Sequence, residues 1–391
     1  MPMTISLCMI VKDESKYIKQ CLESALPVID EAIVVDTGSK DGTIDIVKQY
    51  FGERVKLVSH KWNNDFSEAR NVALKQAKGD WILVLDGDEK LNCEVSKLKE
   101  LLSKDLNEAY YLPIYSFQNS GKVIYSAGMI RLYKRQGAYY EGAIHEQLRF
   151  EHDPPEYVLI DDNICKIFHY GYLKSAYNEK DKYARNIPII KKEIEKEPNN
   201  PFNWYNLGVM EFLNQSHEKA LDHFIKSNSL CNGVRYNFHH DLVLRMGECL
   251  LILGQYQTCI DFFNTVLKDA EMKMRPDLHY YNGIAYSFVK QYEDAVECFK
   301  SCIAIGDVKE GVSEKGIGSF MPLLEWAGIL VTQNKVTEAI MKYMEAVFHP
   351  NNFAKTGAAE LVAVLKKNNM AEVLQELGEH IDLKAIAGVE V

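Results

Sequence analysis

The sequence predicts two fold classes in one chain: an α/β domain up to about residue 172, followed by an all-α domain of helical repeats. The chain has 391 residues, more than one typical hydrophobic core accommodates. In the first part, short apolar runs alternate with helical stretches. In the second part, small and aromatic residues recur at fixed spacing. These observations favour a parallel sheet covered by helices and then a solenoid.

Three short apolar runs in the first part are the predicted β-strands: 5–11 (ISLCMIV), 32–36 (AIVVD) and 81–86 (WILVLD). Each run is apolar on both faces, as a buried parallel strand requires. Helices are predicted between and around them, near 15–25, 42–51 and 65–78. The last helix has a clear start, because Asp65 and Glu68 have the spacing of a capping box.

From about residue 176 the pattern becomes helical and repeats itself. The positions that fit the tetratricopeptide template are Trp204, Leu207, Gly208, Ala220 and Phe224 in the first copy, Gly247, Cys259 and Phe263 in the second, and Gly283, Tyr286, Ala295 and Phe299 in the third. A weaker fourth copy runs through Ala327, Ala339 and Tyr343. A non-repeating helical bundle is the alternative. We therefore predict an α/β domain at 1–172, a linking helical region at 173–200 and repeats at 201–391.

Composition excludes several classes of function. The formal net charge is −10, whereas nucleic-acid-binding proteins show a basic excess or stripe. The first residues lack the basic region and cleavage site of a signal peptide, and runs such as WILVL are too short to span a membrane. Nine scattered cysteines without a C-x-x-C are expected to be free thiols. We expect a cytoplasmic protein with neither a nucleic-acid partner nor a membrane span.

Acidic and turn-forming residues follow each predicted strand. The three segments are VKDES at 11–15, DTGSKDGT at 36–43 and DGDE at 86–89. Ligands of open α/β sheets bind beyond the carboxyl ends of the strands. Carboxylates gathered there repel one another unless a cation or a hydrogen-bond donor lies among them. This edge of the sheet is therefore the predicted ligand site.

Asp86 and Asp88 flank a glycine at the end of the third strand. Residues two apart on a strand point the same way. Hard carboxylate ligands suit Mg²⁺ or Mn²⁺ bridging a diphosphate. The alternative is a polar turn that closes the strand.

The segments MIVKDES, VVDTGSKDGT, NDFSEARN and GDWILVLDGDE, in this order and spacing, resemble the family 2 glycosyltransferases with the GT-A fold. With the repeats, the segments RLYKRQGAYYEGAIHEQL and HYGY are similar to the sublancin-synthase type within that family. The resemblance implies a GT-A domain that takes a UDP-sugar and places the sugar on a peptide side chain, often cysteine, with inversion.

The resemblance also implies how the first two loops bind the donor. Val11, Asp13 and Asp36 would line the uracil and the ribose, whose hydrogen-bonding groups need rigidly held acceptors. Thr37 stands where the family pattern often has a second acid. For Asp36, the alternative is a cap of the turn that follows it.

Arg70 lies outside the predicted buried stripe of its helix, so a solvated position is one interpretation. The resemblance instead points Arg70 toward the nucleotide or the acidic cluster, where a bidentate cation would be useful. It also places Asp86 and Gly87 among the residues that contact the donor.

Glu146, in the segment GAIHEQL, is the predicted general base that takes the acceptor proton, by analogy with the carboxylate base of the family. A surface salt bridge is the alternative role. A cysteine acceptor would need less help than serine, because the thiol pKa is near 8.5.

His169, in FHYGY, is the predicted third metal ligand beside Asp86 and Asp88, and His145 is the alternative ligand. A core histidine is the other interpretation of His169. Gly171 suggests a close backbone approach nearby. An imidazole ligand would favour Mn²⁺ over Mg²⁺.

Together with the resemblance, the sequence predicts a metal-dependent inverting glycosyltransferase that moves a hexose from a UDP-sugar to a Cys, Ser or Thr side chain of a peptide or protein. The repeats would hold the acceptor and could also mediate a homodimer. Two alternatives stay open: an inert scaffold whose repeats bind a protein partner, and a transferase with a lipid or polysaccharide acceptor.

Overall fold

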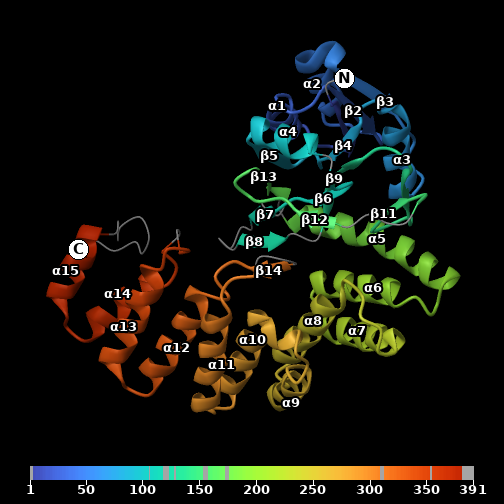
Figure 1. Ribbon diagram of the computed structural model, residues 1–391. Coiled ribbons are helices and arrows are strands. Elements are labelled where there is room, and N and C mark those ends of the chain that lie inside the picture. Colours follow the sequence, from blue (N-terminus) through green and yellow to red (C-terminus); the bar gives the residue numbers. More distant parts are fainter. Residues whose placement is uncertain are drawn as a thin grey trace. The chain divides into compact units, whose positions relative to one another are not determined.

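The computed structural model describes residues 3–104, 106–117, 123–126, 129–152, 157–171, 176–308, 312–352 and 355–380. Contacts divide the chain into two compact units (Figure 1): the first extends to Asn214 and takes in Val312, and the second comprises the chain from Gln215 onward apart from that short return. The predicted fold class is confirmed, because the first unit is built on sheets and the second on helices.

The strands of the first unit are β1 (Ile5–Val11), β2 (Glu31–Asp36), β3 (Val55–Ser59), β4 (Trp81–Val84), β5 (Glu89–Cys93), β6 (Ala109–Tyr111), β7 (Ile114–Phe117), β8 (Val123–Ser126), β9 (Ile130–Lys134), β10 (Ala138–Glu141), β11 (Gln147–Phe150), β12 (Tyr157–Leu159) and β13 (Cys165–His169). Its helices are α1 (Ile18–Ala25), α2 (Thr43–Phe51), the 3-10 turn η1 (Gly52–Arg54), α3 (Phe66–Gln76), α4 (Val95–Ser103), α5 (Ala176–Lys196) and α6 (Pro201–Leu213).

The central sheet has the strand order β12-β6-β9-β4-β1-β2-β3. Strands β1, β2, β3 and β4 run parallel, with Val11 opposite Asp36 and Cys8 opposite Val84. The carboxyl ends of β1, β2 and β4 therefore meet at one edge, as predicted. Strand β9 is inserted antiparallel between β6 and β4. The third predicted strand is shorter than expected and ends at Val84.

Both faces of the central sheet are buried along β1, β2 and β4, which explains the apolar runs in these three strands. One face, with Leu7, Val34 and Leu83, packs against α1, α2 and α4. The other face, with Cys8, Ile33, Val35, Ile82 and Val84, packs against Ala73 and Leu74 of α3. The sheet is thus the rigid support of the loops at its carboxyl edge.

Helix α3 begins where the sequence predicts, but only half of the predicted capping box forms. Oδ1 of Asp65 accepts a hydrogen bond from the backbone N–H of Glu68, 2.9 Å away. The Glu68 side chain does not return the contact, because its carboxylate accepts a hydrogen bond from the Asn63 side chain instead. One N-cap hydrogen bond therefore fixes the start of the helix that carries Arg70.

A second sheet contains the consecutive strands β8-β7-β13-β5. Strand β13 pairs antiparallel with β5, and His169 lies opposite Glu89. Strands β10 and β11 form a separate antiparallel hairpin. The turn after β4 leads into β5, which pairs with β13, and β4 itself pairs with β9.

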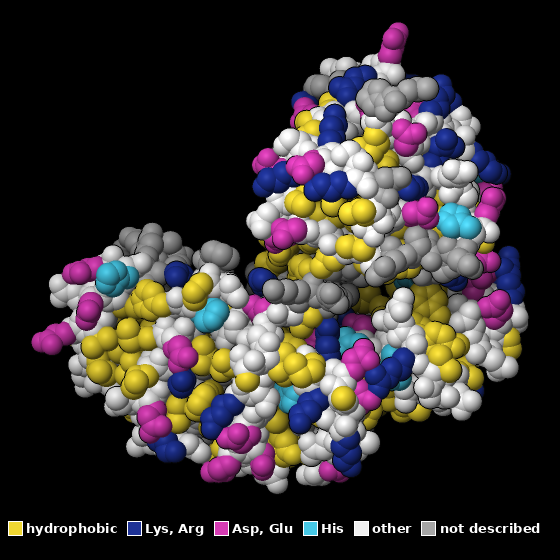
Figure 2. Space-filling view, in the orientation of Figure 1, with side chains coloured by type: hydrophobic (Ala, Val, Ile, Leu, Met, Phe, Trp, Pro, Cys, Tyr) yellow, Lys and Arg dark blue, Asp and Glu magenta, His cyan; other side chains and the backbone are white. Residues whose placement is uncertain are grey.

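The second unit is a series of helix pairs. The elements are α7 (His217–Cys231), α8 (His239–Ile252), α9 (Tyr256–Val266), η3 (Met272–Met274), α10 (Pro276–Phe288), α11 (Tyr292–Ile305), β14 (Val312–Glu314), α12 (Phe320–Thr332), α13 (Val336–Val347), α14 (Ala358–Lys367) and α15 (Ala371–His380). On the face drawn in Figure 2, acidic and basic side chains are interspersed over both units.

The repeat signature is explained by packing within helix pairs. A Cβ at Gly247 of α8 would lie 2.0 Å from the Phe263 ring of α9, so only glycine admits that ring. Phe263 and Phe299 are fully buried, as are the small residues Cys259 and Ala295. No helix in the described ranges is both long and apolar enough to cross a membrane.

Candidate active site at the carboxyl edge of the sheet

The turn Asp86-Gly87-Asp88 follows β4 and leads into β5. Because the strand ends at Val84, the alternation of side chains along a strand does not extend to the two aspartates. The expectation that both point the same way on a strand is wrong. Asp86 contacts arginine side chains and Asp88 contacts His169, so the turn divides its carboxylates between two neighbouring groups.

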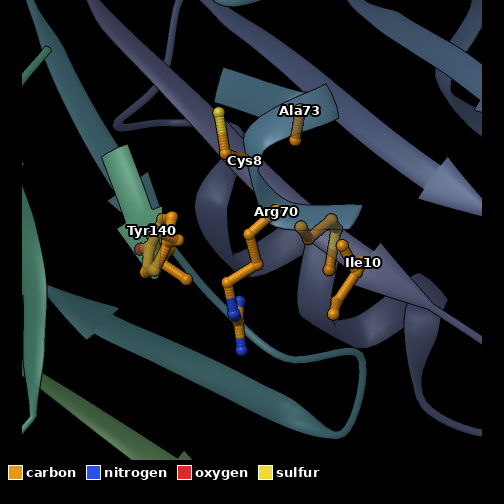
Figure 3. Close-up of a pocket in the computed structure, with 7 residues that line it drawn as sticks. Cys8, Ile10, Arg70, Ala73 and Tyr140 are labelled. Carbon is orange, nitrogen blue, oxygen red and sulfur yellow. The ribbon is translucent and has the colours of Figure 1, made fainter. Parts of the chain in front are cut away.

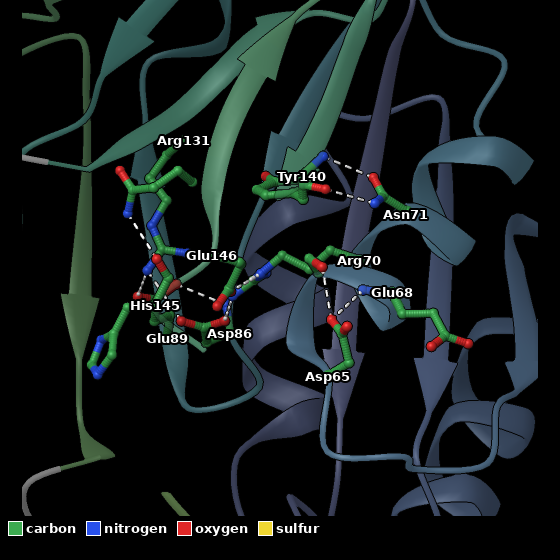
Figure 4. A network of polar contacts seen from close by, with 12 residues as sticks. Asp65, Glu68, Arg70, Asn71, Asp86, Glu89, Arg131, Tyr140, His145 and Glu146 are labelled. Carbon is green, nitrogen blue, oxygen red and sulfur yellow. Dashed lines mark hydrogen bonds and ion pairs between the residues drawn. The ribbon is translucent and has the colours of Figure 1, made fainter. Parts of the chain in front are cut away.

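Asp86 lies between two guanidinium groups (Figure 4). Nη2 of Arg131 is 3.1 Å from Oδ2 of Asp86 and 2.7 Å from Oε1 of Glu89. Nη2 of Arg70 is 3.3 Å from Oδ1 of Asp86, and its Nε donates to Glu146. The Arg70 side chain is only 12 % exposed, so it belongs to the acidic cluster and not to a solvated helix face. Three carboxylates are thereby gathered around two cations.

The two acids held by Arg131 have shifted pKa values in opposite directions. Burial raises the pKa of Asp86, but Arg131 and Arg70 outweigh it and lower that pKa below the ordinary value. Burial raises the pKa of Glu89 to about 7, against the opposing effect of Arg131 and with a further contribution from Asp86. Asp86 is consequently an anion at neutral pH, whereas Glu89 titrates near neutrality.

Asp88 and His169 form the second group. Nε2 of His169 lies 3.5 Å from Oδ1 of Asp88, and Nδ1 lies 3.2 Å from Oγ of Ser116. Burial lowers the pKa of His169, but the hydrogen bond and charge of Asp88 raise it overall. A Cβ at Gly171 would lie 2.4 Å from Oδ2 of Asp88 and 2.5 Å from Nε2 of His169. Glycine is therefore required beside this pair.

The metal site predicted at this turn is only partly supported by the geometry. Asp88 and His169 fit a divalent ion in donor type and face each other, with Gly171 leaving room beside them. Asp86, the third predicted ligand, is engaged by the two arginines. Among the described residues, no group of three or more His, Cys, Asp and Glu side chains is arranged to hold a metal ion. A three-ligand site would thus require Asp86 to exchange an arginine.

His145, the alternative ligand, lies in a different environment. Its φ is 52°, and its ring packs edge-on against Phe202 of α6 at 6.3 Å between centroids. Burial lowers its pKa, and within the described residues its Nε2 has no hydrogen-bond partner. The neighbouring Glu146 is 12 % exposed and is paired with Arg70, so it is not in a surface salt bridge.

The first two loops are hydrogen-bonded to each other. Asp36 accepts the backbone N–H groups of Gly38 at 3.0 Å and Ser39 at 3.2 Å, so the turn-cap alternative for Asp36 is realised. Asp13 has a φ of 55° and accepts the N–H of Lys40 at 2.7 Å. Val11 is buried, and its carbonyl accepts a hydrogen bond from Thr37 Oγ1 at 3.1 Å. Backbone N–H groups thus fix both candidate aspartates.

Arg70 also lines a small pocket (Figure 3). It is lined by Cys8, Met9, Ile10, Arg70, Ala73, Val84 and Tyr140. The Arg70 guanidinium carbon is 5.7 Å from the centre of the Tyr140 ring. Asn71 holds the Tyr140 backbone with two hydrogen bonds of 2.8 Å. Burial raises the pKa of Cys8 to about 12, so this thiol is not a nucleophile. The mostly apolar pocket supports Arg70 and does not suit a charged nucleotide.

Sequence reasoning did not single out Arg131 or Glu89. Arg131 is 3 % exposed and lies in β9 among apolar neighbours. A charged residue inside an apolar strand is a usable signal, since buried arginine needs an anionic partner. The partner could not be named, because it depends on β9 pairing with β4 out of chain order.

Residues 6–155 match the family model described as glycosyl transferase family 2. This segment is a family 2 glycosyltransferase domain. It includes Arg70, Asp86, Asp88, Arg131 and Glu146. The match ends before His169, which lies on β13.

Three relatives extend the comparison beyond that domain. The SPbeta prophage-derived glycosyltransferase SunS of Bacillus subtilis strain 168 and glycosyltransferase SunS of Bacillus phage SPbeta are each 33% identical over 235 residues, covering 57% of this chain and 53% of SunS. A TPR repeat-containing protein of Synechococcus elongatus is 31% identical over 270 residues, covering 66% of each chain. The chain thus spans about half the length of the SunS proteins that it resembles.

Proposed function

We propose that this chain is a cytoplasmic, inverting glycosyltransferase that moves a hexose from a UDP-sugar to a Cys, Ser or Thr side chain of a peptide or protein, with Mn²⁺ or Mg²⁺. The observation that carries the proposal is the meeting of Arg70, Asp86 and Arg131 beside the Asp88–His169 pair, at the edge where β1, β2 and β4 end. Such an edge is where open α/β sheets bind ligands.

In the proposed donor complex, the loops containing Val11, Asp13 and Asp36 hold the uracil and ribose. Gly87 is proposed to lie against the diphosphate; in the structure a Cβ at this position would lie 2.7 Å from Cγ of Glu14. Arg70 has a planar guanidinium already oriented by two carboxylates, and that geometry matches two oxygens of a phosphate group. Arg131 is more deeply buried and holds Asp86 and Glu89 in place.

Asp88 and His169 would hold the divalent ion, with Asp86 as a third ligand once it leaves one arginine. The ion, when bound, neutralises charge on the departing diphosphate as a Lewis acid. A nitrogen ligand favours Mn²⁺ over Mg²⁺. Because Gly171 lies against both side chains, the backbone of the segment after β13 helps to fix their separation.

Glu146 is the proposed base. Its carboxylate is nearly buried and held by Arg70, so its position is fixed before the acceptor arrives. It would take the proton of an acceptor hydroxyl as that oxygen attacks the sugar carbon from the face opposite the diphosphate. One displacement inverts the configuration. A cysteine acceptor would depend less on Glu146.

The repeats are proposed to hold the acceptor, since stacked helix pairs create extended binding surfaces, and to mediate a homodimer if one forms. The domain limits 1–172, 173–200 and 201–391 also stay a proposal. Helices α5 and α6 share an apolar cluster with Ile144, next to Glu146; its buried members are Ile187, Ile190, Leu207 and Met210. A truncated chain that keeps the catalytic part should therefore extend to Asn214.

The proposal is tested with the full chain, UDP-glucose or UDP-N-acetylglucosamine, Mn²⁺ and candidate peptides. Released UDP and the mass of the peptides are measured. We expect UDP release and a peptide heavier by one sugar, both abolished in Asp88→Ala. If no donor is consumed and Asp88→Ala binds UDP as the wild type does, the scaffold alternative replaces the enzyme.

A further inference from the structure

Two cysteines lie opposite each other where β5 and β13 pair. Cys93 ends β5, Cys165 begins β13, and the two residues are in direct register. Directly opposed residues of an antiparallel pair have their side chains on the same face of the sheet. Both cysteines are free thiols. The pKa of each thiol is shifted by the other, as expected for side chains that face each other across the ladder.

The hydrogen-bond pattern shows which kind of pair this is. The N–H of Glu94 donates to the carbonyl of Ile164 at 2.8 Å, which makes that pair a hydrogen-bonded one. Pairs alternate along an antiparallel ladder, so Cys93 and Cys165 occupy a non-hydrogen-bonded pair. The Cα atoms of such pairs are typically about 4.5 Å apart. Disulfides accept Cα separations of about 4.4–6.8 Å. The strands need no rearrangement to be joined.

We propose that Cys93 and Cys165 are a modification site, a dithiol that a low-molecular-weight disulfide oxidises to a cross-strand disulfide. The thiolate of Cys93 attacks one sulfur of the oxidant, whose S–S bond breaks and releases one thiol. Cys165 then loses its proton and attacks Cys93 Sγ, which releases the second thiol. Two S–H bonds of the protein are lost, one S–S bond forms, and the oxidant is reduced to two thiols.

The order of attack follows from access. Cys93 is half-buried, whereas Cys165 is 1 % exposed and cannot meet an oxidant from solvent. The neighbouring Cys165 thiol lowers the pKa of Cys93 against the effect of burial, whereas the Cys93 thiol together with burial raises the pKa of Cys165. Cys93 is thus the attacking thiol and Cys165 the resolving one.

The disulfide would link the strands of the candidate site without occupying it. Strand β5 carries Glu89 and β13 carries His169, and these two residues form the last pair of the same ladder. The Cys93–Cys165 pair is at the opposite end. Oxidation would therefore fix the register of the two strands while leaving the side chains near Asp88 in place.

The experiment treats the native full chain with oxidised glutathione, blocks remaining thiols by alkylation, and maps the digested peptides by mass spectrometry. We expect a crosslinked peptide containing Cys93 and Cys165 that dithiothreitol reverses, with the other thiols alkylated. In Cys165→Ser, Cys93 should retain a glutathione adduct. In Cys93→Ser, Cys165 should stay unmodified.

Cys298 and Cys302 provide the matched control. They are one turn apart on α11, where Cβ atoms about 5–6 Å apart exceed the reach of a disulfide. Cys298→Ser should behave as the wild type does. The proposal is overturned if the wild type keeps both thiols, if Cys93 retains glutathione although Cys165 is present, or if another pair crosslinks first. The peptide map of the oxidised wild type tests the Cys93–Cys165 disulfide even if a variant fails to fold.

Discussion

Glu89→Gln should remove a pH dependence from the stability of the central sheet. Glu89 is buried against Arg131 and Asp86, and its pKa of about 7 compares with an ordinary value of 4.5. The folded state therefore binds this proton more tightly than the unfolded state does. Stability from this group is fully present below the ordinary value and is lost as pH rises toward 7. The difference in pKa corresponds to about 3 kcal/mol.

Hydrogen exchange of the backbone amides of β4 and β9, corrected for the intrinsic exchange rate, measures this pH dependence of stability around Glu89. In the wild type, protection should fall by roughly a hundredfold between about pH 5 and pH 8. In Glu89→Gln the part of that slope due to Glu89 should be lost, which leaves the contributions of His145 and His169, whose pKa values are shifted in opposite directions. Glu94→Gln, an exposed acid beyond the end of β5, is the control and should keep the wild-type slope. A slope that is the same in the wild type and in Glu89→Gln would show that folding does not raise the pKa of Glu89.

Three further substitutions test other parts of the structure. Glu146→Gln should lower kcat on a hydroxyl acceptor by about 10²–10⁴ and leave UDP-sugar affinity unchanged; equal turnover would reject Glu146 as base, and the exposed Glu141→Gln is the control. Gly171→Ala should weaken Mn²⁺-dependent UDP binding at least tenfold, because the methyl group displaces Asp88 and His169; Gly328→Ala meets no atom within 4 Å and should bind UDP normally. Gly247→Ala should destabilise the second unit by about 1–3 kcal/mol in denaturant titrations, and an unchanged midpoint would contradict the packing argument.

Local signals predicted most of the first unit's framework. The strands β1, β2 and β4 and the helix α3 were predictable because their residues encode burial on two faces and an N-cap. The acidic segments after the predicted strands correctly indicated that the candidate site lies at the carboxyl edge of the central sheet. The repeats could also be predicted from local signals, because the glycine of one helix must make room for the phenylalanine ring of the next, as at Gly247 and Phe263.

Longer-range pairing decided what the sequence could not show. Arg131 reaches Asp86 only because β9 enters the sheet beside β4, against chain order. Asp86 and Asp88 contact different side chains because β4 ends at Val84, and the sequence does not mark the last residue of a strand clearly. The half of the capping box that does not form has a local cause, because the Glu68 carboxylate accepts a hydrogen bond from the side chain of Asn63, just before the helix. Each miss involves a contact between segments or an element boundary.

We propose that Asp88 and His169 bind a divalent ion that holds a nucleotide diphosphate at the end of β4. Isothermal titration of UDP with and without Mn²⁺ tests it most directly, in the wild type, Asp88→Ala and His169→Ala. The exposed His152→Ala is the control, since that histidine pairs with Glu108. We expect Mn²⁺ to tighten UDP binding in the wild type and control and to have no effect in the two site variants. If Mn²⁺ still tightens UDP binding in both site variants, Asp88 and His169 do not hold the ion.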